Sequence, residues 1–546
     1  MTSTLAFCEA FENSSERVSK RVGLEQRLDE HYPIRVTEWL KRLPWIEIGI
    51  LALAAGLRVA MLDLKPPHFD EGVNGWFADQ MTRTGYFRYD PTNYHGPLHF
   101  YAVFLSQTLL GRNLWALRLP AIVASLLAVW SLLRFREHFG ASTARLAALA
   151  MAVSPAYIFY GRYSIHESWL VLFSTLFLWA WFGLWEKGER RFLFALFAAA
   201  TGMILTKETY VLHVGSFLLA GLVLQIWQRL LPSRPEMPIA DQRWSWRDLA
   251  AGVALSIFVI VFFYSGTFWD FSGLSGLYET FAAWFHTGVE AAGHEKSTFQ
   301  IGPLNYYWVA LMARYEWPAL LGLMLCFRYI GPSDARLRYV AIHGFGVLLA
   351  YSLIPYKTPW CIISILWPFY LILGAVMLAD ASLASRIPHA IPRFVLAISL
   401  ACSVFLSIRL NFFRFTNQEE PYVYVQTFPD IETLTKPLLS MAGKDPRYYH
   451  VRGQILLESY YPLPWMLGDF TQTGYYKKDE LPENYDADFV VAEVGQMEKI
   501  ESALVGDYYK RRFRLRDSQE ECVVYFRKEK FDAWFKGAPP FFPAGQ

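Results

Sequence analysis

Long apolar runs separated by polar connections constrain the fold more than any other feature of this sequence. An α-helix needs about 20 consecutive apolar residues to cross a hydrocarbon core about 30 Å thick. We predict about eleven such helices, the first near residues 44–62, and therefore a polytopic α-helical membrane protein. The others are expected near residues 116–134, 142–160, 166–185, 192–206, 208–227, 249–264, 316–330, 339–354, 360–379 and 394–411.

The composition agrees with a chain that lies mostly in a bilayer. Only 18% of the 546 residues are charged and 54% are hydrophobic, whereas a soluble domain carries roughly a quarter charged residues. The cysteines are odd in number and lie mostly inside apolar runs, which argues against a disulfide framework. We find no Gly-rich phosphate loop and no Cys/His metal spacing, and we expect no nucleic-acid partner.

The basic residues predict the orientation in the membrane. Every second connection between the apolar runs is basic, and so is the polar N-terminal segment 1–42. Because cytoplasmic loops carry an excess of Lys and Arg, we expect the N-terminus in the cytoplasm. The protein itself is expected in the inner or plasma membrane. The basic connections contain Arg134, Arg136 and Arg145; Lys187, Arg190 and Arg191; Arg229, Arg234, Arg243 and Arg247; Arg328, Arg336 and Arg338; and Arg386 and Arg393.

The first outer connection begins with two adjacent carboxylates, Asp70 and Glu71. Apolar residues at helical spacing follow over 73–81, which predicts an amphipathic helix lying on the bilayer. The apolar stretch 97–110 is too short to cross, so we expect a second surface helix there. Asp70 as a helix N-cap, with Glu71 in the first turn, is the structural alternative to a functional site.

The other outer connections also carry charges close to the membrane surface. Charged residues at that depth are costly, and they are usually paired or functional. Several of these connections are very short turns. Their candidate residues are Arg162 and Glu167 in the second, Lys207 and Glu208 in the third, and Tyr356 and Lys357 in the fifth.

The composition changes near residue 412, where a polar segment begins. We predict three parts: a cytoplasmic tail at 1–42, a transmembrane domain at 43–411 and a small extracytoplasmic α/β domain at 412–546. In the last part, strands are expected at 447–452, 488–494 and 521–527, and helices at 464–470 and 496–505.

Carboxylates and cations that converge on one side of the membrane fit a particular reaction. In a displacement at a sugar carbon with a phosphate leaving group, a carboxylate takes the proton of the acceptor hydroxyl. Arg and Lys stabilise the charge that grows on the departing phosphate. Since no nucleotide site is visible, we expect a lipid-linked phosphosugar as the donor.

The ordered motifs resemble the GT-C superfamily of polytopic glycosyltransferases, which includes the protein O-mannosyltransferases and the aminoarabinose transferase of lipid A. Within it, the chain most resembles the archaeal and bacterial family of flippase-activity-associated membrane proteins. The resemblance covers residues 70–465. The matching motifs are Asp70-Glu71, Tyr89-Asp90-Pro91 with His95-Gly96-Pro97, Tyr160-Gly161-Arg162, Thr206-Lys207-Glu208, Tyr356-Lys357-Thr358-Pro359-Trp360, Pro421-Tyr422-Val423-Tyr424-Val425-Gln426-Thr427 and Pro462-Leu463-Pro464-Trp465.

The resemblance implies an inverting transfer from a polyprenyl-phosphate sugar to an acceptor hydroxyl on the outer face. Asp70 would be the general base, and Glu71 would orient the acceptor or support the fold. Arg162, Lys207 and Lys357 would hold the lipid phosphate. Some members of the superfamily use a divalent metal, so a metal stays open and no other cofactor is assigned. The further substrate-binding candidates are His95, Glu167, Glu208 and Tyr356.

Two other functions remain possible at this stage. The protein could be a non-catalytic component of lipid-linked sugar flipping, which would require polar residues deep inside the spans. We find few there, which favours the enzyme. The C-terminal domain could also be a binding module for a glycan or partner. The sugar and the acceptor, whether glycan, lipid or protein, are not specified by the sequence.

Overall fold

The computed structural model describes residues 44–230, 240–290, 304–329, 334–379, 390–477, 482–517 and 519–540. The predicted N-terminal tail, 1–42, lies outside these residues. The chain divides into two compact units, Met1–Gly49 and Ile50–Gln546.

Within the described residues, seven helical segments are long and apolar enough to cross a membrane, and a bent pair would make an eighth. This pair is α7 (Ala141–Val153) and α8 (Pro155–Gly161), bent by 60°. The seven segments are Trp45–Leu64, Leu114–Phe139, Glu167–Lys187, Tyr210–Leu230, Trp246–Tyr264, Pro359–Met377 and Ala390–Phe413, which contain α2 (Trp45–Val59), α5 (Leu114–Arg134), α9 (Glu167–Lys187), α11 (Tyr210–Leu230), α12 (Trp246–Tyr264), α17 (Ile362–Ala379) and α18 (Ala390–Ile408).

The polytopic helical architecture is confirmed, but the count of eleven spans is not. The three other predicted spans correspond to helices outside this set. They are α10 (Arg190–Ile204), α15 (Trp317–Leu325) and α16 (Ala335–Leu353). The first two are shorter than the length that crosses a hydrocarbon core, and an apolar run alone does not show where a helix ends.

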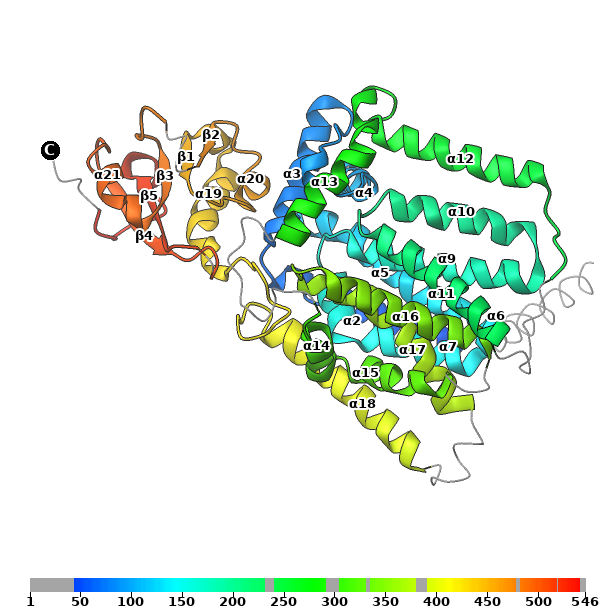
Figure 1. The fold of residues 1–546 in the computed structure, drawn as a ribbon. Coiled ribbons are helices and arrows are strands. Elements are labelled where there is room, and N and C mark those ends of the chain that lie inside the picture. The colour runs from blue at the N-terminus through cyan, green and yellow to red at the C-terminus, as the bar shows by residue number, and fades with distance from the viewer. Residues whose placement is uncertain are drawn as a thin grey trace, which may run out of the picture. The chain divides into compact units, whose positions relative to one another are not determined.

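Burial differs strongly between the spanning helices. The segment containing α17 is 89% buried inside the protein, whereas α12 is only 6% buried. Figure 1 shows α12 and α18 at opposite margins of the helical part, with α17 between them. Exposed apolar side chains such as Ile257 and Phe258 on α12 therefore provide a surface that fits lipid tails.

The predicted helix of the first outer connection is α3 (Phe69–Thr84), and the second short apolar helix is α4 (Leu98–Leu110). Phe77 of α3 stacks edge-on against Phe100 of α4 at 4.9 Å between ring centroids. A second face of α3 has glycine where it meets the C-terminal domain. A Cβ atom on Gly72 would lie 2.4 Å from the Cα of Pro462, so only glycine allows this contact.

The C-terminal domain contains a five-stranded mixed sheet, seen in orange and red beside α3 in Figure 1. The strand order is β2-β1-β3-β5-β4. β1 pairs in parallel with β2 and β3, while β3–β5 and β4–β5 are antiparallel. The strands are β1 (Gly453–Leu456), β2 (Thr473–Tyr476), β3 (Phe489–Glu493), β4 (Tyr508–Phe513) and β5 (Cys522–Arg527).

The sheet confirms two predicted strands and contradicts one. The strands expected at 488–494 and 521–527 are β3 and β5. The strand expected at 447–452 is wrong, because Pro446–His450 forms a 3-10 turn in which the Asp445 carboxylate accepts the N–H of Arg447. Local capping by Asp and the missing N–H of Pro thus favour a turn where the side-chain pattern predicted a strand.

Shorter helices complete the fold. Helices were expected at 464–470 and 496–505, and the structure has shorter ones at those places, α20 and α21. The remaining helices are α6 (Arg136–Phe139), α13 (Gly276–Glu290), α14 (Tyr307–Tyr315), α19 (Glu432–Lys444), α20 (Leu463–Met466), α21 (Met497–Glu501) and α22 (Lys528–Phe531).

Candidate active site

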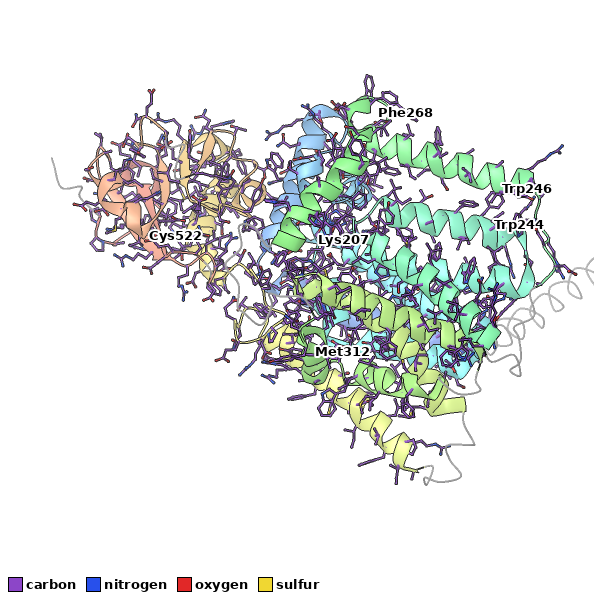
Figure 2. All side chains as sticks on the ribbon, viewed as in Figure 1. Lys207, Trp244, Trp246, Phe268, Met312 and Cys522 are labelled. Atoms are coloured by element: carbon purple, nitrogen blue, oxygen red, sulfur yellow. The ribbon has the colours of Figure 1, made fainter. Side chains whose placement is uncertain are left out.

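A cavity of about 1040 Å³ lies between the C-terminal domain and the connections that precede α3, α9, α11 and α17. The start of α3, the turns before α9 and α11, and the turn before α17 all contribute to its lining. Figure 2 shows Lys207, which lines it, among the helices, and Cys522 in the C-terminal sheet. Seven of the nine predicted site residues line the cavity: Asp70, His95, Glu167, Lys207, Glu208, Tyr356 and Lys357.

Asp70 stands in the first turn of α3 with its side chain 37% exposed. It is not the N-cap. His68 fills that position, and its Nδ1 accepts the backbone N–H of Asp70 at 3.1 Å. His68 Nδ1 lies 3.9 Å from a carboxylate oxygen of Asp70. Because capping is done by His68, the carboxylate of Asp70 is left open to the cavity.

His68 is held in one tautomer by its two contacts. Nδ1 is an acceptor, so the ring proton is on Nε2, which donates to the carbonyl of Tyr424 at 2.8 Å. Burial lowers the pKa of His68 below its ordinary value. A neutral imidazole therefore fixes the start of α3 against the segment that precedes the C-terminal domain.

Glu71 has a structural position and does not line the cavity. Its side chain is fully buried, and the guanidinium of Arg118 donates to both carboxylate oxygens at 2.8 Å. The backbone N–H groups of His68 and Ser164 also donate to it, each at 2.9 Å. Burial alone would raise the pKa of Glu71, but Arg118 outweighs this effect and lowers it. Four hydrogen bonds occupy the carboxylate, which leaves none of its oxygens for a substrate.

Arg162 also lies away from the cavity, contrary to the predicted phosphate contact. Its guanidinium donates to the carbonyls of Leu57 and Met61, at 3.0 and 2.8 Å, where α2 ends. The last carbonyls of a helix lack partners within the helix, and a cation there is favourable. Arg162 is therefore placed to cap α2 and to join the first and second outer connections.

The motif Thr206-Lys207-Glu208 is joined directly to the first outer connection. His95 and Lys207 form an antiparallel backbone bridge. The N–H of Gly96 donates to the carbonyl of Thr206 at 3.1 Å, and a Cβ on Gly96 would lie 2.4 Å from the backbone of Leu205. Two motifs that are more than one hundred residues apart in the sequence thus form one wall of the cavity.

Lys207 is buried and lies between two carboxylates. It forms a close ion pair with Glu167, and Glu208 is 3.8 Å away. Burial lowers the pKa of Lys207, but the two carboxylates outweigh that effect and raise it well above its ordinary value. Lys207 is therefore a permanent cation whose charge is already offset.

His95 and Glu208 form a second polar pair in the same wall. His95 Nδ1 lies 2.9 Å from a carboxylate oxygen of Glu208. Since an ionised carboxylate only accepts, Nδ1 carries the proton, and Nε2 is the ring nitrogen left for other partners. The ring of His166 lies 4.5 Å from that of His95, which fixes the orientation of the pair.

Lys357 differs from Lys207 in its surroundings. Its ammonium donates to the carbonyl of Ile354 at 2.8 Å, and burial lowers its pKa to about 8. Tyr356 lines the cavity beside it, with its hydroxyl 3.4 Å from that of Tyr424. A desolvated ammonium attracts an incoming anion more strongly than a solvated one.

The sequence reasoning missed two residues of this region. Arg118, the partner of Glu71, had a usable signal, because an arginine inside an apolar run needs a buried partner. Arg516 of the C-terminal domain lines the cavity, is 2% exposed and stacks over Phe69 at 5.0 Å from the ring centroid. No local pattern distinguishes it from the other arginines of that domain.

Comparisons with known proteins were made for the sequence and for the structure. A family model described as dolichyl-phosphate-mannose-protein mannosyltransferase matches residues 94–262. A comparison with curated protein sequences gives no match.

Two solved structures of ArnT from Cupriavidus metallidurans resemble this chain. The one bound to undecaprenyl phosphate has a TM-score of 0.57 at 16% identity, over 87% of this chain and 97% of that one. The apo structure has a TM-score of 0.55 at 16% identity, over 90% and 98%.

The fold is shared with ArnT, one of the enzymes in the superfamily that the sequence motifs resemble. The family match together with this fold indicates a glycosyltransferase of the GT-C class. At this level of identity, the likeness to ArnT establishes the fold alone, so the roles of individual residues depend on the geometry of the cavity.

Proposed function

We propose that this protein transfers a sugar from a polyprenyl-phosphate donor to a hydroxyl of an acceptor on the outer face of the membrane. The matched family model is named for a dolichyl-phosphate-mannose donor, and the ArnT structure of the same fold is bound to undecaprenyl phosphate. Both are polyisoprenoid phosphates, whose tails fit among apolar helices.

One observation carries the proposal: an open carboxylate and a desolvated lysine line the same cavity. Asp70 presents its carboxylate without a capping contact, and Lys357 presents an ammonium. A reaction that moves a proton from a hydroxyl and releases a phosphate needs one group of each kind.

The proposed step is a single displacement. A carboxylate oxygen of Asp70 accepts the proton of the acceptor hydroxyl while the hydroxyl oxygen forms a bond to the anomeric carbon. The bond from that carbon to the phosphate oxygen breaks, and its electron pair leaves with the polyprenyl phosphate. Attack and departure take place on opposite faces, so the anomeric configuration inverts.

The structure changes which cations we assign to the phosphate. Lys357 is the first choice, because its ammonium lines the cavity and burial weakens its hydration. Lys207 already lies between Glu167 and Glu208, so we assign it to positioning His95 and the cavity wall. Arg162 contacts backbone carbonyls of α2 and is left out of the phosphate site.

The distribution of charges at the two ends of α9 and α11 supports a location of the cavity on the outer face of the membrane. Glu167 lines the cavity at the start of α9, whereas Lys187 ends the same helix. Likewise, Glu208 precedes α11, and Arg229 lies in its last turn. The cavity thus lies at the helix ends opposite the basic residues, which the positive-inside rule assigns to the cytoplasm. We therefore propose a cytoplasmic N-terminus and an extracytoplasmic domain from about residue 412.

The test uses purified protein in nanodiscs with a panel of polyprenyl-phosphate hexoses and pentoses. Release of free polyprenyl phosphate is followed for the wild type, Asp70→Asn and the control Glu279→Gln, an exposed residue of α13 outside the cavity lining. We expect release with one donor, a loss of about 100-fold or more in Asp70→Asn, and no loss in the control.

Two results would redirect the proposal. Full release by a folded Asp70→Asn variant would show that the base is another residue. Translocation of the lipid-linked sugar in proteoliposomes, with no release from any donor, would favour the flipping alternative.

A further inference from the structure

One wall of the cavity comes from the C-terminal domain, and its chemistry differs from that of the wall built by the membrane helices. We call it the acidic wall. The helical side combines the cations Lys207 and Lys357 and the imidazole of His95 with the carboxylates Asp70, Glu167 and Glu208. The acidic wall consists of Glu458, Glu493, Asp517, Gln519 and Glu520, with Arg516 as its cation.

Contacts connect the acidic wall to the proposed base. Arg516 stacks over Phe69, the residue next to Asp70. Its guanidinium donates to the hydroxyl of Ser459 at 3.3 Å and to the carbonyl of Tyr461. The backbone N–H of Glu458 then donates to Glu493 at 3.3 Å. The wall therefore continues from the Asp70 side of the cavity through a chain of contacts.

Buried polar atoms in this wall lack partners within the described residues. The Nε of Arg516 is one, on a side chain that is 2% exposed. The Oε1 of Gln519 is another. Glu493 is 7% exposed, and its contacts with Glu458 and Gln519 both use Oε1. Buried polar groups in native proteins are nearly always satisfied, so these atoms point to an occupant of the cavity.

Of these atoms, Gln519 Oε1 is an acceptor and Arg516 Nε is a donor, and the carboxylates that line the wall add further acceptors. Carboxylates and an amide oxygen are satisfied by hydroxyl or ammonium donors, whereas a phosphate offers only acceptors and adds like charge. A phosphate on the occupant would therefore be repelled from this wall. The lipid phosphate of the donor would be repelled in the same way, and it would remain on the side of Lys357.

We propose that the acidic wall is the acceptor subsite, and that it takes a sugar with free hydroxyls, binds an amino sugar more tightly and rejects a phosphorylated sugar. This inference depends on the proposed glycosyl transfer for its role, but its binding chemistry can be measured alone. Lys357 on the helical side and the carboxylates of the acidic wall then keep the donor phosphate and the acceptor from exchanging places.

The test compares three probes on the full-length protein in nanodiscs: methyl glucosaminide, methyl glucoside and glucose 6-phosphate. Binding is measured by titration for the wild type, Glu493→Gln and the control Glu529→Gln, an exposed carboxylate of α22 outside the cavity. We expect affinity to fall in the order amine, hydroxyl, phosphate. Glu493→Gln should weaken the amine probe about tenfold, as expected for a charge-assisted hydrogen bond, and the control should not.

A second variant controls for misfolding of Glu493→Gln. Glu520→Gln changes an exposed member of the wall, so its folding is expected to be normal, and it should weaken the amine probe in the same direction. In a transfer assay, Glu493→Gln should raise KM for methyl glucosaminide more than it lowers kcat. Equal binding of glucose 6-phosphate, or an amine preference unchanged in both variants, would overturn the subsite. Absence of release from every donor, with the binding order intact, would instead overturn the transfer reaction.

Discussion

Replacing Glu71 by Gln should lower the stability of the protein without removing a catalytic group. The carboxylate and Arg118 are both fully buried and share two hydrogen bonds of 2.8 Å. Removing one charge of a buried pair leaves the other unpaired, which costs about 3 to 5 kcal/mol. At ~2 °C per kcal/mol for a large chain, the melting midpoint in detergent should fall by about 6–10 °C.

The pH dependence of stability checks the cause. Arg118 holds the pKa of Glu71 below its ordinary value of 4.5. A lowered carboxylate pKa stabilises the fold at pH values above 4.5, and this stabilisation is lost as the pH falls through the folded pKa. The wild type should therefore lose its advantage over Glu71→Gln as the pH falls below 4.5.

A matched pair of variants separates charge from packing. Glu71→Gln with Arg118→Met removes both charges, so it should recover part of the lost midpoint. At the permissive temperature, folded Glu71→Gln should still release polyprenyl phosphate from the donor. An unchanged midpoint in Glu71→Gln would refute the structural role, and loss of release in a fully folded variant would return Glu71 to the catalytic group.

Three further changes test other parts of the structure. Lys357→Met should raise KM for the donor about tenfold or more, as expected when a charge-assisted phosphate contact is lost. The donor affinity of the wild type should fall as the pH rises through about 8, where Lys357 loses its proton. Steady-state kinetics would measure both effects. Gly75→Ala places a Cβ 2.3 Å from Trp465 and should lower the melting midpoint, whereas Gly49→Ala, with open space around it, should not. Arg162→Gln should destabilise the protein but leave donor KM unchanged.

The sequence supports the location of the site better than the role of each residue. Lys207, Glu208 and Lys357 could be predicted because they lie in short turns close to the membrane. A charge there is costly unless it is paired or has a function. The backbone bridge between His95 and Lys207 explains why two such turns meet. A pattern of turns shows on which side residues lie, and the structure adds which of them face the same cavity.

Long-range pairing explains what could not be predicted. Glu71 and Arg118 are 47 positions apart, and Arg162 reaches carbonyls about one hundred positions earlier. In the sequence, Glu71 and Arg162 resemble site residues, because each is a charged residue next to the membrane. In the structure, their contacts are those of structural residues. Arg516 is the reverse case, because its place beside the cavity depends on the packing of the C-terminal sheet domain against Phe69 at the start of α3.

The side chains of Asp70 and Glu71 point in different directions from α3, so the two carboxylates cannot have the same function. Successive residues on an α-helix point about 100° apart, since a turn has 3.6 residues. When α3 directs Glu71 inward to Arg118, Asp70 must project toward the cavity. His68 completes this division, because its side chain caps Asp70 N–H while its backbone N–H donates to Glu71. Glu71 therefore anchors the start of α3, and Asp70 is free to act as the base in the proposed reaction. An exchange of Asp70 and Glu71 should remove both the anchoring and the proposed proton transfer.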